Sequence, residues 1–125
     1  MLDDSFRQAA EEAPVIRLLD RILRQAIKDL AKEIHIESFE GKARLQFLIN
    51  GAFHEISPPA PQFLVPIIGR LKILGKLKLS EQQEIQEGGF RMRMEDREWY
   101  FKIVTKPVPG GEKVIIILLK ESRVL

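Results

Sequence analysis

The sequence predicts an α+β fold, in which two main helices pack on a mainly antiparallel sheet of about five to six strands. In segments 15–34 and 62–74 the apolar residues recur every three or four positions, as they do in amphipathic helices. Other segments alternate apolar and polar residues and are separated by turn sequences such as Asn50-Gly51 and Pro107–Gly111. The resulting order is helix, three strands, helix, three strands, and it places helices against an antiparallel sheet.

The first helix is predicted to begin at Pro14, because a proline fits the first turn, where its missing N–H is not needed. Its apolar stripe continues as far as Ile34. Before it, residues 5–12 are polar and alanine-rich, which indicates only weak helical character. We therefore expect residues 1–11 to be a loosely ordered extension of a single domain that covers residues 1–125.

A second face of this helix is basic, because Arg17, Arg21, Arg24 and Lys28 recur at helical spacing. Acidic residues at 20 and 29 interrupt the stripe. Such a stripe is most simply a solvated face. The alternative is a docking surface for an acidic partner or for anionic lipid headgroups.

The next segments are predicted to form strands. Ile34–Glu37 alternates as a short strand does, and Lys42–Ile49 is followed at once by Asn50-Gly51. Asn-Gly is the strongest two-residue hairpin signal because both residues tolerate positive φ, so Ala52–Ile56 is expected to be the returning strand. The proline-rich segment Ser57–Pro61 must then be a connector.

The second half of the chain is predicted to begin with a helix over Gln62–Leu74, which has Pro66 in or near its first turn. Gly75–Gly89 is the least regular part. Two strands are expected at Phe90–Met94 and Glu98–Thr105.

Lys113–Lys120, almost entirely apolar, is expected to be a central strand that is buried on both faces. If it were instead an edge strand, it could pair with another chain. In the preceding strand Trp99 and Phe101 share one face, which indicates core packing.

Composition excludes several classes of function. The chain has no cysteine and only two histidines, His35 and His54, so a thiolate or histidine-rich metal site is not expected. A formal net charge of +2 does not indicate nucleic acid as a partner. The longest apolar run, Val114–Leu119, is far shorter than the roughly 20 residues that a membrane-spanning helix needs. Together with an N-terminus that does not resemble a signal peptide, this predicts a cytoplasmic protein.

No catalytic site can be assembled from the sequence. The glycine-rich segment 110–114 lacks the hydroxyl residue of a phosphate-binding loop and leads into a strand, so it is interpreted as a hairpin turn. His35 is most simply a structural residue of a strand. His54 and Glu55 are adjacent in a strand and point to opposite faces, so they cannot act as a pair. We expect neither an enzyme nor a bound cofactor.

Several short segments follow one another in a distinctive order: 12–19 (EAPVIRLL), 25–28 (QAIK), 33–37 (EIHIE), 43–55 (ARLQFLINGAFHE), Pro58-Pro59, 69–74 (GRLKIL) and 111–115 (GEKVI). Together they resemble the region that precedes the motor core of type II secretion and type IV pilus assembly ATPases. The resemblance extends over about residues 12–120. It implies a PAS-like second N-terminal domain that packs on the motor domain of a neighbouring subunit in a hexamer, with arginines that reach the nucleotide bound there.

The chain departs from this family in its charges. Of three alternating arginines in the first hairpin only Arg44 is present, and glutamine and leucine stand at 46 and 48. The arginine pair that follows Glu81 in the family is Gln82-Gln83 here, position 89 is glycine, and two strand arginines are replaced by Lys102 and Ile117. Glutamine does not replace the charged, planar guanidinium that binds phosphate. The sequence also ends where the motor domain of the family would begin, so ATP hydrolysis by that route is not expected.

These departures lead us to expect a non-catalytic protein-interaction or regulatory domain. Its partner would be a secretion or pilus assembly ATPase, another component of such a complex, or a second copy of the chain. The residues expected to contact it are Arg17, Arg21, Arg24, Lys28, Arg44, Glu81, Gln82 and Gln83. The alternative is a PAS-like sensor that holds a small molecule between sheet and helix.

Overall fold

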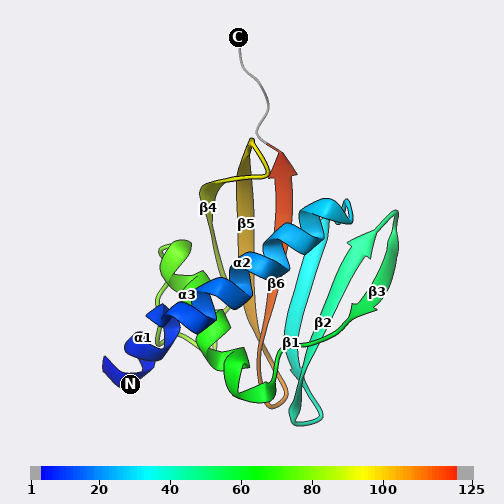
Figure 1. Cartoon of the computed structure of the whole chain (residues 1–125). Coiled ribbons are helices and arrows are strands. Elements are labelled where there is room, and N and C mark those ends of the chain that lie inside the picture. Colours follow the sequence, from blue (N-terminus) through cyan, green and yellow to red (C-terminus); the bar gives the residue numbers. More distant parts are fainter. Residues whose placement is uncertain (1–3, 121–125) are drawn as a thin grey trace.

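The computed structural model describes residues 4–120 and confirms the α+β prediction (Figure 1). The helices are α1 (Asp4–Glu11), α2 (Ala13–Lys28) and α3 (Leu64–Leu74), and the short 3₁₀ helix η1 (Pro61–Phe63) precedes α3. The strands are β1 (Glu33–Phe39), β2 (Lys42–Ile49), β3 (Ala52–Ile56), β4 (Gln86–Met94), β5 (Arg97–Val108) and β6 (Gly111–Lys120). They form one antiparallel sheet in the order β3-β2-β1-β6-β5-β4. β6 is therefore a central strand, as predicted.

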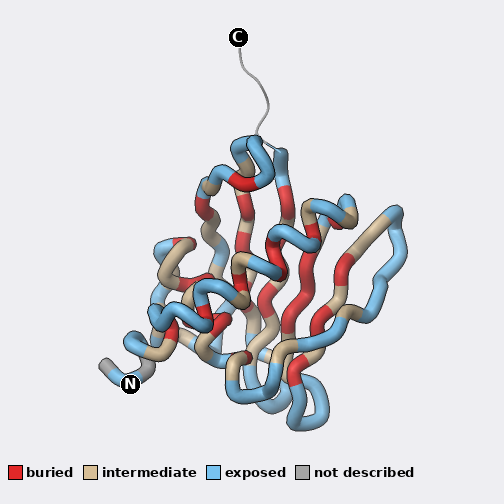
Figure 2. The backbone as a smooth tube through the Cα atoms, viewed as in Figure 1, coloured by how far each residue is buried: buried red, intermediate tan, exposed pale blue. Residues whose placement is uncertain are grey.

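The helices lie on one face of this sheet, and α2 crosses it diagonally (Figure 1). The buried side chains of α2, such as Leu19 and Leu23, join one core with Ile34, Phe47 and other residues of the strands. In Figure 2 buried stretches of the backbone appear on the helices and on the strands beneath them. On the same side Phe101 stacks on Phe90 and Trp99, at ring-centroid distances of 5.1 Å and 6.3 Å. The other face of the sheet has no helix packed on it among the described residues (Figure 1). We call it the open face.

Turn chemistry explains how the strands are paired. Asn50 and Gly51 have φ values of 51° and 79°, which confirms the predicted hairpin between β2 and β3. In the turn between β4 and β5, Glu95 and Asp96 also have positive φ values, although neither residue is a glycine. As expected, the segment that resembled a phosphate loop is the β5–β6 turn.

The prediction that residues 113–120 are buried on both faces was wrong. Val114, Ile116 and Leu118 are buried under the helices, whereas Leu119 on the other face is 46% exposed. The reason is that the helices cover one face only. An apolar run in a central strand therefore leaves apolar side chains on the open face.

Two boundaries also differ from the prediction. The first helix ends at Lys28, although its apolar pattern continues, because Leu30 takes a φ of 61° and the Ala31 N–H donates back to the Ala26 carbonyl. β4 begins at Gln86, inside the segment expected to be irregular.

The predicted N-terminal extension contains α1, and Ala10 at the end of that helix is fully buried. α1 packs against α3. In the part of the chain that the structure describes, no helix has the length and apolarity needed to cross a membrane.

Candidate functional site

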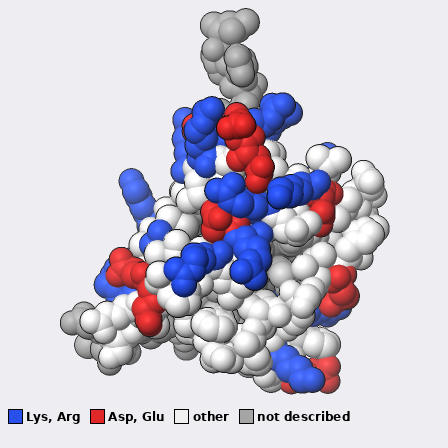
Figure 3. Space-filling view, in the orientation of Figure 1, with Lys and Arg blue, Asp and Glu red and all other residues white. Residues whose placement is uncertain are grey.

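The predicted contact residues lie in three separate places. Arg17, Arg21, Arg24 and Lys28 are exposed on the outer side of α2, where Figure 3 shows lysine and arginine side chains gathered among a few acidic ones. Arg44 lies on the open face of the sheet, because it alternates with the core residues of β2. Glu81, Gln82 and Gln83 belong to the loop between α3 and β4.

On α2, Arg24 differs from its basic neighbours because it joins two elements. Its Nε atom donates to Asp20 at 2.7 Å, and its Nη1 atom donates to Glu95 of the β4–β5 turn at 3.3 Å. The hydrogen bond to Asp20 raises the pKa of Arg24 above its ordinary value. Arg24 therefore helps to hold α2 against the sheet, whereas Arg17, Arg21 and Lys28 present their charges to solvent.

On the open face, Arg44 is held by two neighbours. Its Nη2 atom lies 3.1 Å from Glu55 of β3, and its guanidinium carbon lies 4.8 Å from the ring centre of Phe39. The hydrogen bonds between Arg44 and Glu55 raise the pKa of the arginine and lower that of the carboxyl. The charge of Arg44 is thus largely neutralised within the domain.

We expect Arg44→Met to return the pKa of Glu55 towards its ordinary value of 4.5, because the guanidinium hydrogen bond is the main cause of its lowering. A carboxyl with a lowered folded-state pKa stabilises the fold above its unfolded pKa and loses that effect as pH falls through the folded one. The change with pH that Glu55 contributes to the free energy of unfolding should therefore lie below pH 4.5, and it should disappear in Arg44→Met. Carbon-detected NMR titration of the Glu55 carboxyl measures its pKa in the wild type and in Arg44→Met. Arg44→Lys is the charge-preserving control. Identical titration curves for Glu55 in the wild type and in Arg44→Met would contradict it.

One row of residues crosses the open face from edge to edge. In register, Phe53 of β3 is opposite Leu48 of β2, Leu48 is opposite Glu33 of β1, and Glu33 is opposite Ile117 of β6. Ile117 is in turn opposite Lys102 of β5, and Lys102 is opposite Gly89 of β4. We call these six residues the cross-strand row. Four of its positions, 48, 89, 102 and 117, are those at which the family resemblance implies arginine.

At one end of the cross-strand row, Tyr100 packs closely over Gly89. A Cβ atom built on Gly89 would lie 2.6 Å from the ring carbon Cζ of Tyr100 and 2.8 Å from the carbonyl oxygen of Phe101. Real Cβ atoms essentially never come within 3.0 Å of another heavy atom. The aromatic ring therefore occupies the space through which a side chain at position 89 would leave the backbone.

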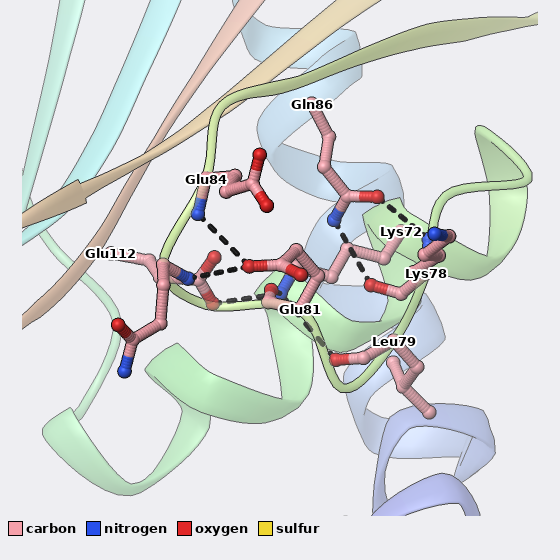
Figure 4. A network of polar contacts seen from close by, with 8 residues as sticks. Lys72, Lys78, Leu79, Glu81, Glu84, Gln86 and Glu112 are labelled. Atoms are coloured by element: carbon pink, nitrogen blue, oxygen red, sulfur yellow. Dashed lines mark hydrogen bonds and ion pairs between the residues drawn. The ribbon is translucent and has the colours of Figure 1, made fainter.

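The loop that contains Gln82 and Gln83 is held by a buried lysine that the sequence analysis did not identify. The Nζ atom of Lys72 donates to the Glu81 carbonyl at 2.7 Å and to Glu112 Oε1 at 2.8 Å, with a longer contact of 3.5 Å to the Leu79 carbonyl (Figure 4). Its side chain is 2% exposed and that of Glu112 is 10% exposed. This buried ion pair fastens the loop to α3 and to the β5–β6 turn.

The side chains of the same loop add local hydrogen bonds. Glu81 Oε2 accepts from the backbone N–H groups of Gln83 and Glu84, both at 2.9 Å. The side-chain amide of Gln86 exchanges two bonds with the backbone of Lys78 (Figure 4). The loop therefore has a defined shape, and Gln82 and Gln83 are exposed on it.

A cavity of about 580 Å³ lies beside this loop. It is lined by Ser38, Gly41, Lys42, Pro61, Leu64, Val65, Ile68, Lys72, Gln82, Gln83, Pro107, Val108, Gly110, Gly111 and Glu112. They come from η1, from α3 and the loop after it, and from around the β1–β2 and β5–β6 turns. These two turns lie side by side at one end of the sheet (Figure 1). The space between the sheet and α2, where the alternative sensor interpretation would place a ligand, is filled by the apolar core.

The two histidines lie outside the cavity. His35 Nε2 lies 2.8 Å from Glu33 Oε1, and the imidazole packs edge-on against Phe53 at 4.8 Å on the open face. His54 and Glu55 point to opposite faces, as predicted. Glu55 pairs with Arg44 on the open face, and His54 is opposite the core residue Phe47 on the other face. Within residues 4–120, no three acidic or histidine side chains gather in a way that could hold a metal ion.

Comparison with known proteins identifies relatives along nearly the whole chain. Residues 8–125 match the family described as Type II/IV secretion system protein. Type II secretion system protein E of Xanthomonas campestris pv. campestris is 32% identical over 98% of the chain, and Type IV pilus assembly ATPase PilB of Myxococcus xanthus is 37% identical over 95%. Type II secretion system protein E of Dickeya dadantii is 34% identical over 97%. The matched segments make up 22%, 21% and 24% of these relatives, so the chain spans about a fifth to a quarter of their length.

Proposed function

Because the chain belongs to the Type II/IV secretion system protein family, we propose that it is a non-catalytic accessory domain that binds protein through the open face of its sheet. Its proposed partner is the motor region of an ATPase of the same family, in the same or a neighbouring chain. In this proposal the arginine contacts to nucleotide that the resemblance implies have been lost. A cytoplasmic location is part of the same proposal.

The cross-strand row is the observation that supports this proposal most directly. Positions 48, 89, 102 and 117 are far apart in the sequence, yet the register of the sheet brings them into one line. If all four were arginine, the line would be a strip of positive charge suited to phosphate. Here the four residues are leucine, glycine, lysine and isoleucine, and Glu33 lies between Leu48 and Ile117, so the row carries one lysine and one carboxylate in place of that strip.

The charges that remain on the open face are consistent with a protein partner. Four cations there have a carboxylate neighbour on the same face: Arg44 with Glu55 at 3.1 Å, Lys102 with Glu87 at 3.4 Å, Lys113 with Glu37 at 3.5 Å and Arg93 with Glu98 at 3.5 Å. In each pair the carboxylate offsets the charge of the cation, so these four cations attract an anion such as ATP less than unpaired cations would. The open face thus carries apolar side chains such as Leu48 and Ile117 beside charged ones, and interfaces between proteins commonly combine the two.

We propose two further contact regions. Arg17, Arg21, Arg24 and Lys28 of α2 would bind acidic side chains of the partner, with Arg24 also kept in its contacts to Asp20 and Glu95. Glu81, Gln82 and Gln83 would contribute polar contacts from the loop after α3. Both regions lie outside the open face, so their contributions can be measured separately.

The proposal predicts that Ile117→Glu weakens binding to the motor region at least about tenfold, because a charged side chain then replaces an apolar one at the centre of the proposed interface. Binding is measured by titration calorimetry with the motor domain of a family ATPase from the same genome. Ala60→Glu in the connector before α3 is the control, since Ala60 is exposed and belongs to none of the proposed contact regions. In the same assay the double variant Arg17→Glu/Arg21→Glu should also bind more weakly than the wild type. The difference should be larger at low salt than at high salt.

A titration of the domain with a fluorescent ATP analogue tests the loss of nucleotide contacts. We expect no saturation at micromolar concentrations. The proposal is wrong if the analogue binds tightly and Arg44→Met abolishes that binding. It is equally wrong if Ile117→Glu binds the motor region as strongly as the control variant and the wild type do.

A further inference from the structure

We infer that Leu30, just after α2, is an apolar anchor whose side chain inserts into an apolar, acid-rimmed pocket of the partner protein. The Leu30 side chain is 79% exposed, more than any other large apolar side chain whose exposure the structure describes. The inference rests on the proposed function, because it takes the motor region of a family ATPase as the partner. It adds an apolar contact to the basic contact region proposed on α2.

The backbone of Leu30 has a conformation that a leucine side chain makes less stable. Its φ of 61° lies in the left-handed region, where the Cβ atom of an L-residue crowds the backbone and glycine is the usual residue. The Leu30 N–H donates to the Ile27 carbonyl at 3.1 Å, and the Ala31 N–H donates to the Ala26 carbonyl at 2.9 Å. Backbone groups alone make these two bonds, so the turn does not need a leucine side chain.

The end of α3 shows what this turn itself requires, because α3 ends in the same way. Lys76 has a φ of 59°, and its N–H donates to the Ile73 carbonyl at 3.2 Å. The Leu77 N–H donates to the Lys72 carbonyl at 2.8 Å, which completes the same pair of bonds. Lys76, the equivalent of Leu30, is polar and exposed. The turn therefore forms without an apolar side chain at this position.

The Leu30 side chain thus serves neither the turn nor the core of the free domain. It strains the backbone and leaves its apolar surface in water, and both effects lower the stability of the domain. Burying a leucine side chain in a pocket of the partner would strengthen binding by about tenfold to a hundredfold. Strain and exposure at the same residue therefore indicate a contact outside the domain.

The residues beside Leu30 indicate the chemistry of the pocket. Lys28 and Lys32, two positions away on either side, are exposed. Asp29 is only partly exposed, and its Oδ1 atom accepts from Gln25 at 2.8 Å. An apolar pocket with carboxylates on its rim complements this arrangement of charges. A lipid bilayer fits less well, because helices that bind membranes insert an apolar face, and the apolar face of α2 is packed in the core.

Replacing Leu30 with glycine in the whole chain tests the inference. Because glycine adopts the left-handed conformation without strain, Leu30→Gly should raise the melting temperature by about 2–5 °C. It should also weaken binding to the motor domain of a family ATPase from the same genome, measured by titration calorimetry, by about tenfold or more. Leu30→Met keeps an apolar side chain and should bind within about twofold of the wild type. Lys32→Glu, which tests the acidic rim, should bind more weakly than the wild type at low salt.

Lys76→Gly is the matched control, because it relieves the same backbone conformation after α3, outside the proposed contact regions. It should raise the melting temperature by a similar amount and leave binding unchanged. The inference fails if Leu30→Gly binds as strongly as Lys76→Gly does, or if Leu30→Gly lowers the melting temperature. It also fails if Lys32→Glu binds as strongly as the wild type at low salt.

A sedimentation assay with phosphatidylserine vesicles tests a membrane as the alternative partner. The inference is wrong if the wild type sediments with the vesicles and Leu30→Gly does not. The proposed function survives each of these results provided that Ile117→Glu still weakens binding to the motor domain. If the wild type does not bind the motor domain at all, both the inference and the proposed function are wrong.

Discussion

Replacing Lys72 with methionine is expected to lower the free energy of unfolding by about 3–5 kcal/mol. Methionine keeps the apolar stem but leaves the side chain of Glu112, only 10% exposed, as a buried carboxylate with no counter-ion. It also removes the bond from Lys72 to the Glu81 carbonyl, which fastens the loop after α3. Urea denaturation followed by tryptophan fluorescence measures the change.

Two further variants separate the buried charge from the loss of the lysine itself. Lys72→Met combined with Glu112→Leu removes both charges and should recover a large part of the lost stability. Lys102→Met breaks an exposed ion pair of 3.4 Å with Glu87 and should cost less than about 1 kcal/mol. If Lys72→Met were no more destabilising than Lys102→Met, the ion pair would not have the structural role assigned to it.

The second large effect is expected at the edge of the open face. Gly89→Arg should destabilise the domain by at least about 1–3 kcal/mol, the usual cost of forcing extra atoms into a packed site. A Cβ atom there would meet the Tyr100 ring at 2.6 Å and the Phe101 carbonyl oxygen at 2.8 Å, so both a side chain and the backbone would have to move. Thermal unfolding by circular dichroism measures the loss.

Combining Gly89→Arg with Tyr100→Ala tests the cause of this effect. Removing the ring should relieve one of the two clashes, so the double variant should lose less stability than the sum of the two single variants. Strict additivity would mean that Tyr100 does not block position 89. In that case glycine at this position would have to be explained by the backbone contact alone.

Local chemistry explains why much of the fold could be predicted from the sequence. Asn50-Gly51 specifies a turn through its own backbone preferences, and the alternation in Lys42–Ile49 reports which side chains face the core. The end of α2 could not be predicted in this way. Leu30 adopts a left-handed conformation that usually favours glycine, and it is held there by contacts that form only once Ala31 has folded back onto α2.

The candidate sites were harder to predict because they depend on register and on contacts between distant residues. Arg44 and the substituted positions were identified one by one, but nothing local shows that 48, 89, 102 and 117 form a line across the sheet. Lys72 looks like an ordinary surface residue of a helix until Glu112, 40 positions later, packs against it. A lysine placed between Leu71 and Ile73 in the apolar helix was the available signal.

Within residues 4–120, helices pack on one face of the sheet and the open face has no helix on it. The stability of the domain therefore depends on whether a partner protein covers the open face. A protein that covers this side and binds only the folded chain adds about 2.7 kcal/mol at 100 times its Kd. The melting temperature of the domain would then report the concentration of that protein.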